Sequence, residues 1–501
     1  MGLTPRAPLG RHVHLIGSAG AGMRSLADVF SGMGWTLSGS DLTLGGHHPA
    51  RLPDETELVV YSAAVPADNP ELCRARELGI PAYSCFEAIG RLMSGRNGLA
   101  VAGTHGKSTT TAMAAEILVG AGMDPTVLFG AAALGARSGG RAGRSDLVLA
   151  EACEYRGNFL HLAPRHAVIL GIEPDHFDCY PSLDRLQEAF GEFAGKLPES
   201  GWLLVRHDCP IARRVAARAA CAVETFGIQP GPDWSARGLR RLGKGQEEEP
   251  LHDTSPKRKR GSDNANPRLR FGLVLGPPSP AKGACPRFSS GCYALEIYHG
   301  ERSLGVVELG VPGRHNVLNA LAAAALASAV GAAPEQIGAG LGRFRGLQRR
   351  LEVLGNFGGV VVIDDYAHHP TEVSASLAAV REMYPCRPLC CVFQPHQVSR
   401  TERLLDELAE SLQNVERVVV AEIFRAREGP VRAGEVTAAD LARQIRTGGA
   451  EALAIPTWDG ILRYLETHLT AGDVLVTMGA GDIGRMTHEF VERLRENRAV
   501  G

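Results

Sequence analysis

Residues 102–110 read Ala-Gly-Thr-His-Gly-Lys-Ser-Thr-Thr, and this stretch predicts a phosphate-binding loop between a strand and a helix. The apolar run Leu99 to Ala102 before it is typical of a buried parallel strand, and Thr111 to Val119 after it is typical of a helix. A strand that turns through glycines into a helix presents free backbone N–H groups and the positive end of the helix dipole. The stretch therefore predicts a site for a polyphosphate.

Within this loop, Lys107 is expected to neutralise the β- and γ-phosphates of ATP, and the Ser108 hydroxyl to ligate Mg²⁺. The general G-x-x-x-x-G-K-[ST] pattern is not met, because its first glycine would fall at Val101, so the prediction depends on the compact G-T-x-G-K-[ST] form. An incidental Gly-Lys-Ser turn is the alternative. The residues expected to hold ATP here are Gly103, Thr104, His105, Gly106, Lys107, Ser108 and Thr109.

Two later strands are predicted to end in side chains that can bind a metal. Asp146 to Ala150 leads into Glu151, and Ala167 to Gly171 leads into Glu-Pro-Asp-His-Phe-Asp, which contains His176. Ligands gather at the carboxyl edge of a parallel sheet, and carboxylate and imidazole both coordinate divalent ions. We expect Glu151 and His176 to join Ser108 around Mg²⁺; a helix-capping or solvated acid and a packed surface histidine are the alternatives.

The N-terminal region predicts a second ligand site. A strand from His12 to Ile16 runs into the glycine-rich residues 17–23, then into a helix and a second strand that ends at Asp41. This is the order of a mononucleotide-binding βαβ unit. Because the spacing is G-x-x-G-x-G rather than G-x-G-x-x-G, a diphosphate ligand other than a dinucleotide is favoured.

The C-terminal third predicts another α/β domain. Asn316 and Asn319 lie three residues apart at the start of an alanine-rich helix, where their amides can reach a ligand, although Asn316 can also be read as a helix cap. After Arg350, four apolar runs each end in polar residues, with helical stretches between them, which predicts a doubly wound sheet. These runs begin at Val360, Leu389, Val418 and Val474.

The length of 501 residues suggests about three domains, with expected boundaries of 1–97, 98–345 and 346–501. The predicted fold class is α/β throughout, with a Rossmann-like first domain, a central ATPase-type domain with the phosphate loop, and a Rossmann-like third domain. Residues from about 243 to 288 are rich in Ser, Asn, Pro and mixed charge, which favours a disordered surface insertion over a nucleic-acid patch.

The composition of the chain indicates which partners and which cellular compartment to expect. A net charge of −2 argues against nucleic-acid or membrane-surface affinity, and there is neither a signal-peptide pattern nor an apolar run of membrane-spanning length. The eleven cysteines form no C-x-x-C pair, which favours reduced thiols over a metal site or disulfides. We expect a cytoplasmic protein without membrane insertion, which is a monomer or weak homodimer.

Taken together, the motifs resemble the Mur ligases, enzymes of peptidoglycan synthesis. The resemblance runs from about His12 to Met486, apart from the insertion. It depends on a series of motifs in order: GxxGxGM, SDL, YSAAVP, GTHGKST, EACEY, EPDHFD, GRHNVLNA, RR, DDYAHHPTEV, FQPHQVSRT and GAGDIG.

The resemblance implies ATP-dependent ligation of L-alanine to the lactyl carboxylate of UDP-N-acetylmuramate through an acyl phosphate. It implies that Asn316, Asn319 and Arg350 contact ATP or its transferred phosphate, that Asp365 reaches the nucleotide, and that His368 and Arg400 orient substrate. The implied catalytic residues are Lys107, Glu151, His176, Arg350, Asp365, His368 and Arg400. The implied UDP-binding residues are Gly17, Ser18, Ala19, Gly20, Ala21, Gly22, Met23, Asp41 and Ser62.

This chain departs from the family pattern in places. Ser108 stands where Thr is usual, Gly171 where Asn is usual, and Gln397 where Arg is usual, and EACEY replaces EADES. Two alternatives stay open: a ligase that recycles murein tripeptide, which should lack the FQPHxxSRT-type stretch that this chain retains, and a non-catalytic homologue.

Overall fold

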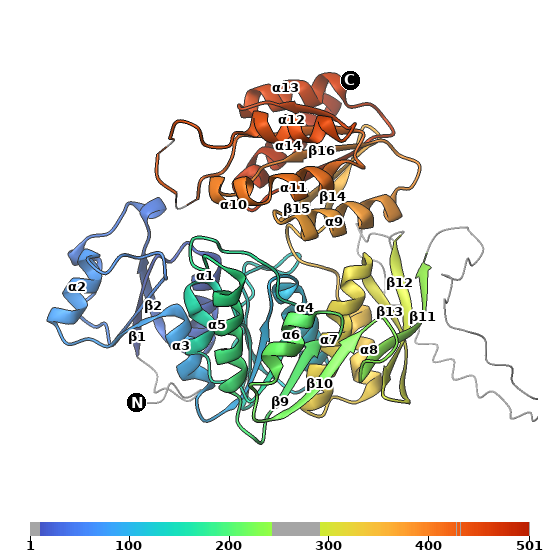
Figure 1. The fold of residues 1–501 in the computed structure, drawn as a ribbon. Coiled ribbons are helices and arrows are strands. Elements are labelled where there is room, and N and C mark those ends of the chain that lie inside the picture. Colours follow the sequence, from blue (N-terminus) through green and yellow to red (C-terminus); the bar gives the residue numbers. More distant parts are fainter. Residues whose placement is uncertain (1–10, 243–290, 427, 431, 500–501) are drawn as a thin grey trace, which may run out of the picture.

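The computed structural model describes residues 11–242, 291–426, 428–430 and 432–499. It contains three sheets in chain order, each accompanied by helices (Figure 1). The expected insertion at about 243–288 lies outside the described residues. Within the described ranges no cysteine forms a disulfide, and no helix combines the length and apolar composition that crossing a membrane requires.

The first sheet is parallel and has the strand order β2-β1-β3-β4. Its strands are β1 (His12–Ile16), β2 (Thr36–Ser40), β3 (Leu58–Tyr61) and β4 (Ala82–Ser84). Its helices are α1 (Ala21–Gly32), α2 (Pro70–Glu77) and α3 (Cys85–Met93), with short 3₁₀ helices η1 (Leu42–Leu44) and η2 (Pro49–Arg51). The strand, glycine-rich turn, helix and second strand therefore follow one another as predicted.

The central sheet has nine strands in the order β13-β12-β11-β10-β9-β8-β5-β7-β6. The strands from β6 to β11 are parallel neighbours, whereas β12 pairs antiparallel with both β11 and β13. The strands are β5 (Asn97–Ala102), β6 (Thr126–Leu128), β7 (Leu147–Glu151), β8 (His166–Ile169), β9 (Trp202–Arg206), β10 (Ala222–Gly227), β11 (Trp234–Leu242), β12 (Cys292–His299) and β13 (Arg302–Pro312). The helices are α4 (Lys107–Gly120), η3 (Tyr155–His161), α5 (Leu183–Gly195), α6 (Pro210–Ala216), α7 (Arg314–Ala329) and α8 (Pro334–Arg343).

The two faces of the central sheet bury different partners, because successive side chains of a strand point to opposite faces. Ala100 and Ala102 of β5 belong to an apolar cluster that includes α5, α6 and, from the first domain, Phe30 of α1 and Leu92 of α3. Leu99 and Val101 face the cluster built by α4, α7 and α8. The first domain therefore shares a continuous core with the central sheet.

The third sheet has six strands in the order β14-β15-β19-β16-β17-β18, of which only the β14–β15 pair is antiparallel. Its strands are β14 (Glu352–Phe357), β15 (Val360–Asp365), β16 (Leu389–Phe393), β17 (Arg417–Val420), β18 (Glu451–Ala454) and β19 (Val474–Met478). Its helices are α9 (Pro370–Met383), α10 (Val398–Arg403), α11 (Leu405–Leu412), α12 (Ala438–Thr447), α13 (Trp458–His468) and α14 (Ile483–Ala499).

Helices cover both faces of this sheet: α9, α11 and α12 pack on one, and α13 and α14 on the other. The doubly wound class and the four predicted strands, β15, β16, β17 and β19, are therefore confirmed, but two strands of this sheet were not predicted. The two additional strands, β14 and β18, are the edges of the sheet. Both have partly exposed side chains, so neither has the continuous apolar run of the buried strands.

Candidate functional site

The predicted phosphate loop connects β5 to α4, as its sequence indicates. Gly103 and Gly106 have φ angles of 127° and 80°, which favour glycine, and Gly106 is the N-cap of α4. A Cβ atom on Gly106 would lie 2.4 Å from Asn319 Oδ1, so this close approach also requires glycine. Thr104 binds the loop after β8, since its backbone N–H donates to Gly171 O at 2.9 Å.

Lys107 is held in place by the buried carboxylate of Glu154, which was not among the predicted site residues. Its Nζ donates to Gly103 O at 2.6 Å, to Thr104 O at 2.9 Å and to Glu154 Oε1 at 3.1 Å. Burial opposes the charge of Lys107, but the Glu154 and Glu151 carboxylates and other neighbouring groups together outweigh it and raise the pKa of the lysine. Lys107 is thus a permanent cation at the start of α4.

The three predicted metal ligands do not all contact one another. Ser108 Oγ donates to Glu151 Oε2 at 2.8 Å, and the same oxygen accepts the Gly130 N–H at 2.8 Å. His176 Nε2 instead lies 3.3 Å from Glu154 Oε1. The structure therefore joins Ser108 to Glu151, and it joins His176 to the Lys107–Glu154 pair.

A cleft between the central and third domains contains most of the other residues that were expected to bind ATP. Its walls include His105, Gly106, Thr109, Asn316, Asn319, Arg350 and Asp365. His105, Gly106 and Thr109 come from the phosphate loop and the first turn of α4. The two asparagines come from the start of α7, and Arg350 and Asp365 come from the third domain. Residues far apart in the sequence thus meet beside the phosphate loop.

The two asparagines form one hydrogen-bonded unit. Asn319 Nδ2 donates to Asn316 Oδ1 at 3.0 Å, and Asn316 Nδ2 donates to Pro312 O at 2.7 Å. The N-cap of α7 is Gly313, so Asn316 does not cap the helix. Asn319 Oδ1 in turn accepts the Thr110 hydroxyl at 3.3 Å, which connects α7 to α4.

Arg350 and Asp365 form the third domain's side of the cleft. Asp365 accepts backbone N–H groups from Leu351 at 2.6 Å and from Ala367 at 2.7 Å. Burial raises the pKa of Asp365 to about 6, although Arg350 and these hydrogen bonds act in the opposite direction. Arg350 lies 3.7 Å from Glu372 Oε1 and 5.0 Å from the centre of the Tyr366 ring. Arg350 is therefore a cation facing the cleft, as its predicted role requires.

His368 and Arg400, the predicted substrate-orienting residues, lie in a polar layer between the two domains. Arg400 is 3% exposed and donates to Asp175 Oδ1 from Nε at 3.0 Å and from Nη2 at 2.7 Å. His368 Nδ1 lies 3.0 Å from Tyr366 O and 3.2 Å from Glu372 Oε2, and burial lowers the pKa of its imidazole to about 4. In this arrangement Arg400 binds a protein carboxylate, Asp175. The substituted position Gln397 is the N-cap of α10, with a φ angle of 69°.

The predicted UDP-binding residues lie at the carboxyl end of the first sheet. Asp41 Oδ2 accepts the Ala19 N–H at 3.0 Å, and Asp41 Oδ1 accepts the Thr43 N–H at 2.9 Å as the cap of η1. A Cβ on Gly17 would lie 2.9 Å from Ser62 Cβ, so the glycine-rich turn packs directly on the loop after β3. The structure therefore brings the turn, Asp41 and Ser62 to one edge of the sheet, and none of them lines the cleft.

Several side chains of the site were missed: Glu154, Glu173, Asp175, His315, His369 and Glu372. Each lies within a motif quoted from the sequence or beside a selected residue, and Glu372 follows His369 by three positions at the start of a helix. That spacing, which places both side chains on one helix face, was the available signal.

Comparison with known proteins identifies relatives over the whole chain. Residues 12–97 match the description Mur ligase family, catalytic domain; residues 101–249 match Mur ligase middle domain; and residues 349–481 match Mur ligase, glutamate ligase domain. A UDP-N-acetylmuramate–L-alanine ligase of Clostridium acetobutylicum is 34% identical over 97% of this chain and 98% of its own length. The enzyme of that name from Desulfitobacterium hafniense is 36% identical, over 96% of this chain and 99% of its own.

Solved structures share the three-domain fold. The UDP-N-acetylmuramate–alanine ligase of Thermotoga maritima has a TM-score of 0.73 at 23% identity and covers 97% of this chain and 99% of its own. A murein peptide ligase of Psychrobacter arcticus has a TM-score of 0.63 at 22% identity, with coverage of 97% and 99%.

Proposed function

Since this chain belongs to the Mur ligase family, we propose that it joins L-alanine to the lactyl carboxylate of UDP-N-acetylmuramate while ATP is converted to ADP and phosphate. The observation that carries the proposal is the cleft in which the phosphate loop of the central domain faces Arg350 and Asp365 of the third. The curated alanine-adding relatives, which align with nearly the whole chain, support this choice of substrate.

A carboxylate is a poor acyl donor, so the reaction needs two steps. A lactyl carboxylate oxygen first attacks the γ-phosphorus of ATP; ADP leaves and an acyl phosphate forms. The amine of alanine then attacks the acyl carbon, the bond from that carbon to the phosphate oxygen breaks, and the amine loses a proton. Lys107 and Arg350 are the cations that we propose stabilise the charge on the transferred phosphoryl group.

We propose that Ser108 and Glu151 bind Mg²⁺, and that His176 approaches it when nucleotide is present. A hydroxyl and a carboxylate oxygen that already meet at the start of α4 fit the oxygen ligands that Mg²⁺ prefers. A bound Mg²⁺ supplies positive charge beside the β- and γ-phosphates.

Each of the three domains has its own proposed role in binding substrates. We propose that residues 1–97 hold the UDP moiety at the edge formed by Gly17, Asp41 and Ser62, and that residues 98–345 hold ATP. Residues 346–501 would contribute Arg350 and Asp365 to ATP, and His368 and Arg400 to alanine or to the acceptor carboxylate. For Arg400 to do so, its contact with Asp175 must open or be shared when substrate binds. The proposed compartment is the cytoplasm, where UDP-linked precursors and ATP are available.

The test is a substrate panel. Purified protein is incubated with ATP, Mg²⁺, UDP-N-acetylmuramate and, in separate reactions, L-alanine, L-serine, glycine or the murein tripeptide, and phosphate release is measured. We expect release that requires both acceptor and amino acid and is fastest with L-alanine. Preference for the tripeptide would identify a recycling ligase instead, and no acceptor-dependent release with any of them would contradict the proposal.

A further inference from the structure

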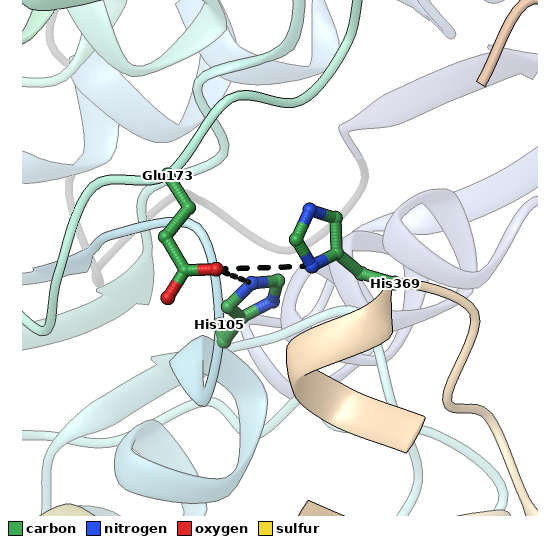
Figure 2. Close-up of side chains that lie close together, drawn as sticks. All are labelled: His105, Glu173 and His369. Carbon is green, nitrogen blue, oxygen red and sulfur yellow. Dashed lines mark ion pairs between the residues drawn. The ribbon is translucent and has the colours of Figure 1, made fainter. Parts of the chain in front are cut away.

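Two histidines and a glutamate converge where the phosphate loop meets the third domain (Figure 2). His105 comes from the loop before α4, Glu173 from the loop after β8, and His369 from the N-cap of α9. His105 Nε2 lies 3.4 Å and His369 Nδ1 3.8 Å from Glu173 Oε2, and one ligand atom from each residue lies within 4.8 Å of the others. The ligase mechanism proposed above uses His105 only as part of the phosphate loop and gives no role to Glu173 or His369.

The second nitrogen of each imidazole has its own acceptor. His105 Nδ1 lies 3.2 Å from Glu372 Oε1, and His369 Nε2 lies 3.2 Å from Pro174 O. The Glu173 and Glu372 carboxylates outweigh burial and raise the pKa of His105 to about 9, so a metal ion has to displace the proton on Nε2. Once it does, the lone pairs of His105 Nε2 and His369 Nδ1 face Glu173. Metal-binding histidines are fixed in this way, with the non-ligating N–H donated to a carboxylate or a backbone carbonyl.

The two separations from Glu173 Oε2 are close to those of a small tetrahedral ion, and the two imidazole nitrogens lie within 4.8 Å of each other. Zinc-to-nitrogen distances of about 2.0–2.1 Å place two ligand atoms roughly 3.3–3.4 Å apart in a tetrahedral site. The 3.4 Å contact already matches, and the 3.8 Å contact needs a shift of a few tenths of an ångström. His105 Nε2 is buried and has the Glu173 carboxylate at 3.4 Å as its ion-pair partner. The Glu173 side chain is 37% exposed, which leaves the ion a route from the cleft.

Thr371 contacts two of these ligand residues and leaves both of them able to bind a metal. Its hydroxyl donates to Glu173 Oε2 at 2.5 Å, which leaves the carboxylate further lone pairs. Its backbone N–H approaches His369 Nδ1 at 3.4 Å, a long contact that a metal bond can replace.

We propose that His105 Nε2, His369 Nδ1 and one Glu173 oxygen form a binding site for a transition-metal dication of the zinc class. Imidazole nitrogens suit Zn²⁺ and its neighbours, whereas Mg²⁺ prefers oxygen ligands in an octahedron. Two ligands belong to the central domain and one to the third. A bound ion therefore ties the domains together beside the nucleotide cleft, which opposes the opening needed for nucleotide exchange, so Zn²⁺ inhibits turnover.

Cobalt(II) is the probe for the test, because four-coordinate Co²⁺ absorbs visible light strongly. Metal-free full-length protein is titrated with Co²⁺ and then with Zn²⁺ as competitor. The variant His369→Asn removes a good ligand and keeps a side chain that caps α9, and Glu173→Gln keeps an acceptor for Thr371. His299→Asn, which alters a histidine–glutamate pair elsewhere on the surface, is the matched control.

We expect saturation at one equivalent, displacement by Zn²⁺, and at least tenfold weaker Co²⁺ binding in both H369N and E173Q, with H299N unchanged. In the phosphate-release assay, Zn²⁺ should inhibit H369N at least tenfold less strongly than the unaltered chain. Equal affinity in the unaltered chain and both variants would overturn the proposal, as would absorption bands of cysteine-bound cobalt that persist in the variants. The optical readout needs no turnover, so its failure is separable from failure of the proposed function.

Discussion

His315 lies in the first turn of α7, facing the cleft. Burial, with Arg350 nearby, lowers the pKa of its imidazole from 6.5 to about 4. The unfolded chain therefore takes up a proton at this residue as the pH falls below 6.5, while the folded chain stays neutral there until about 4. The free energy of unfolding therefore does not depend on His315 above pH 6.5. It falls because of this residue as the pH drops from 6.5 towards 4.

Replacing this histidine should reduce the acid sensitivity of the fold. In His315→Gln the proton uptake on unfolding disappears, which removes up to about 1.4 kcal/mol per pH unit from the pH dependence of stability within the window. Thermal unfolding, followed by circular dichroism as the pH is lowered from 6.5 towards 4, is the measurement. H315Q should lose less stability than the unaltered chain, and an equal loss would contradict this assignment.

Single site residues could be predicted where they belong to one contiguous motif. Lys107 and Ser108 were selected from the phosphate loop, and Ser108 does meet the predicted Glu151. Glu154, which holds Lys107, was missed because no spacing in the sequence shows which acid after β7 is buried against the lysine. Similarly, no spacing in the sequence indicates that Arg400 binds Asp175, 225 residues away.

Among the helices, α3 shows how closely the first domain packs on the central one. A Cβ atom at Gly90, in the middle of α3, would lie 1.9 Å from the backbone oxygen of His161 in η3. Helix propensity favours alanine over glycine by about 1 kcal/mol, but overpacking costs about 1–3 kcal/mol, so packing outweighs propensity here.

We therefore expect Gly90→Ala to lower the thermal unfolding midpoint. Gly22→Ala is the matched control, because Gly22 lies inside α1 and a Cβ there would meet nothing within 4 Å. This control should raise stability by about 0.5–1 kcal/mol. Scanning calorimetry measures both, and a midpoint for G90A at or above that of the unaltered chain would show that the two domains do not pack this closely.

The predicted insertion can be tested through the strands on either side of it. Leu242 at the end of β11 pairs with Cys292 at the start of β12, so the described chain continues as an antiparallel hairpin. Deleting residues 245–285 shortens the connection between these strands, and the entropy of closing a connection depends only weakly on its length. The deletion variant should keep its ligase rate and its thermal midpoint. Loss of folded protein would show that the segment contributes to the core.

Interior strands were predictable and edge strands were not. β15, β16 and β19 are buried on both faces and are visible as continuous apolar runs. β18 has only one buried side chain, that of Ala452. β14 contains Gly355, which has no side chain, and the polar residue Asn356. Such strands are stabilised mainly by hydrogen bonds to a neighbour, which the periodicity of a sequence does not record.

At the scale of the whole molecule, the loop after β8 is the joint between the central and third domains. Pro174 O lies 3.2 Å from His369 Nε2, Glu173 accepts the Thr371 hydroxyl at 2.5 Å, and Asp175 binds Arg400. The sequence of this segment predicts metal ligands. Its position between domains could not be predicted, because the relative placement of domains depends on surfaces that no local pattern describes.

In the proposed reaction, this joint closes a site in which a carboxylate is activated by phosphorylation. UDP-N-acetylmuramate labelled with oxygen-18 in its lactyl carboxylate tests it directly, in a reaction with ATP, Mg²⁺ and L-alanine. An acyl phosphate requires that one labelled oxygen passes to inorganic phosphate for each amide bond formed, and that the other stays in the amide. Mass spectrometry of the phosphate should show this transfer. Amide formation with unlabelled phosphate, or labelled acceptor recovered without any amide, would contradict the account.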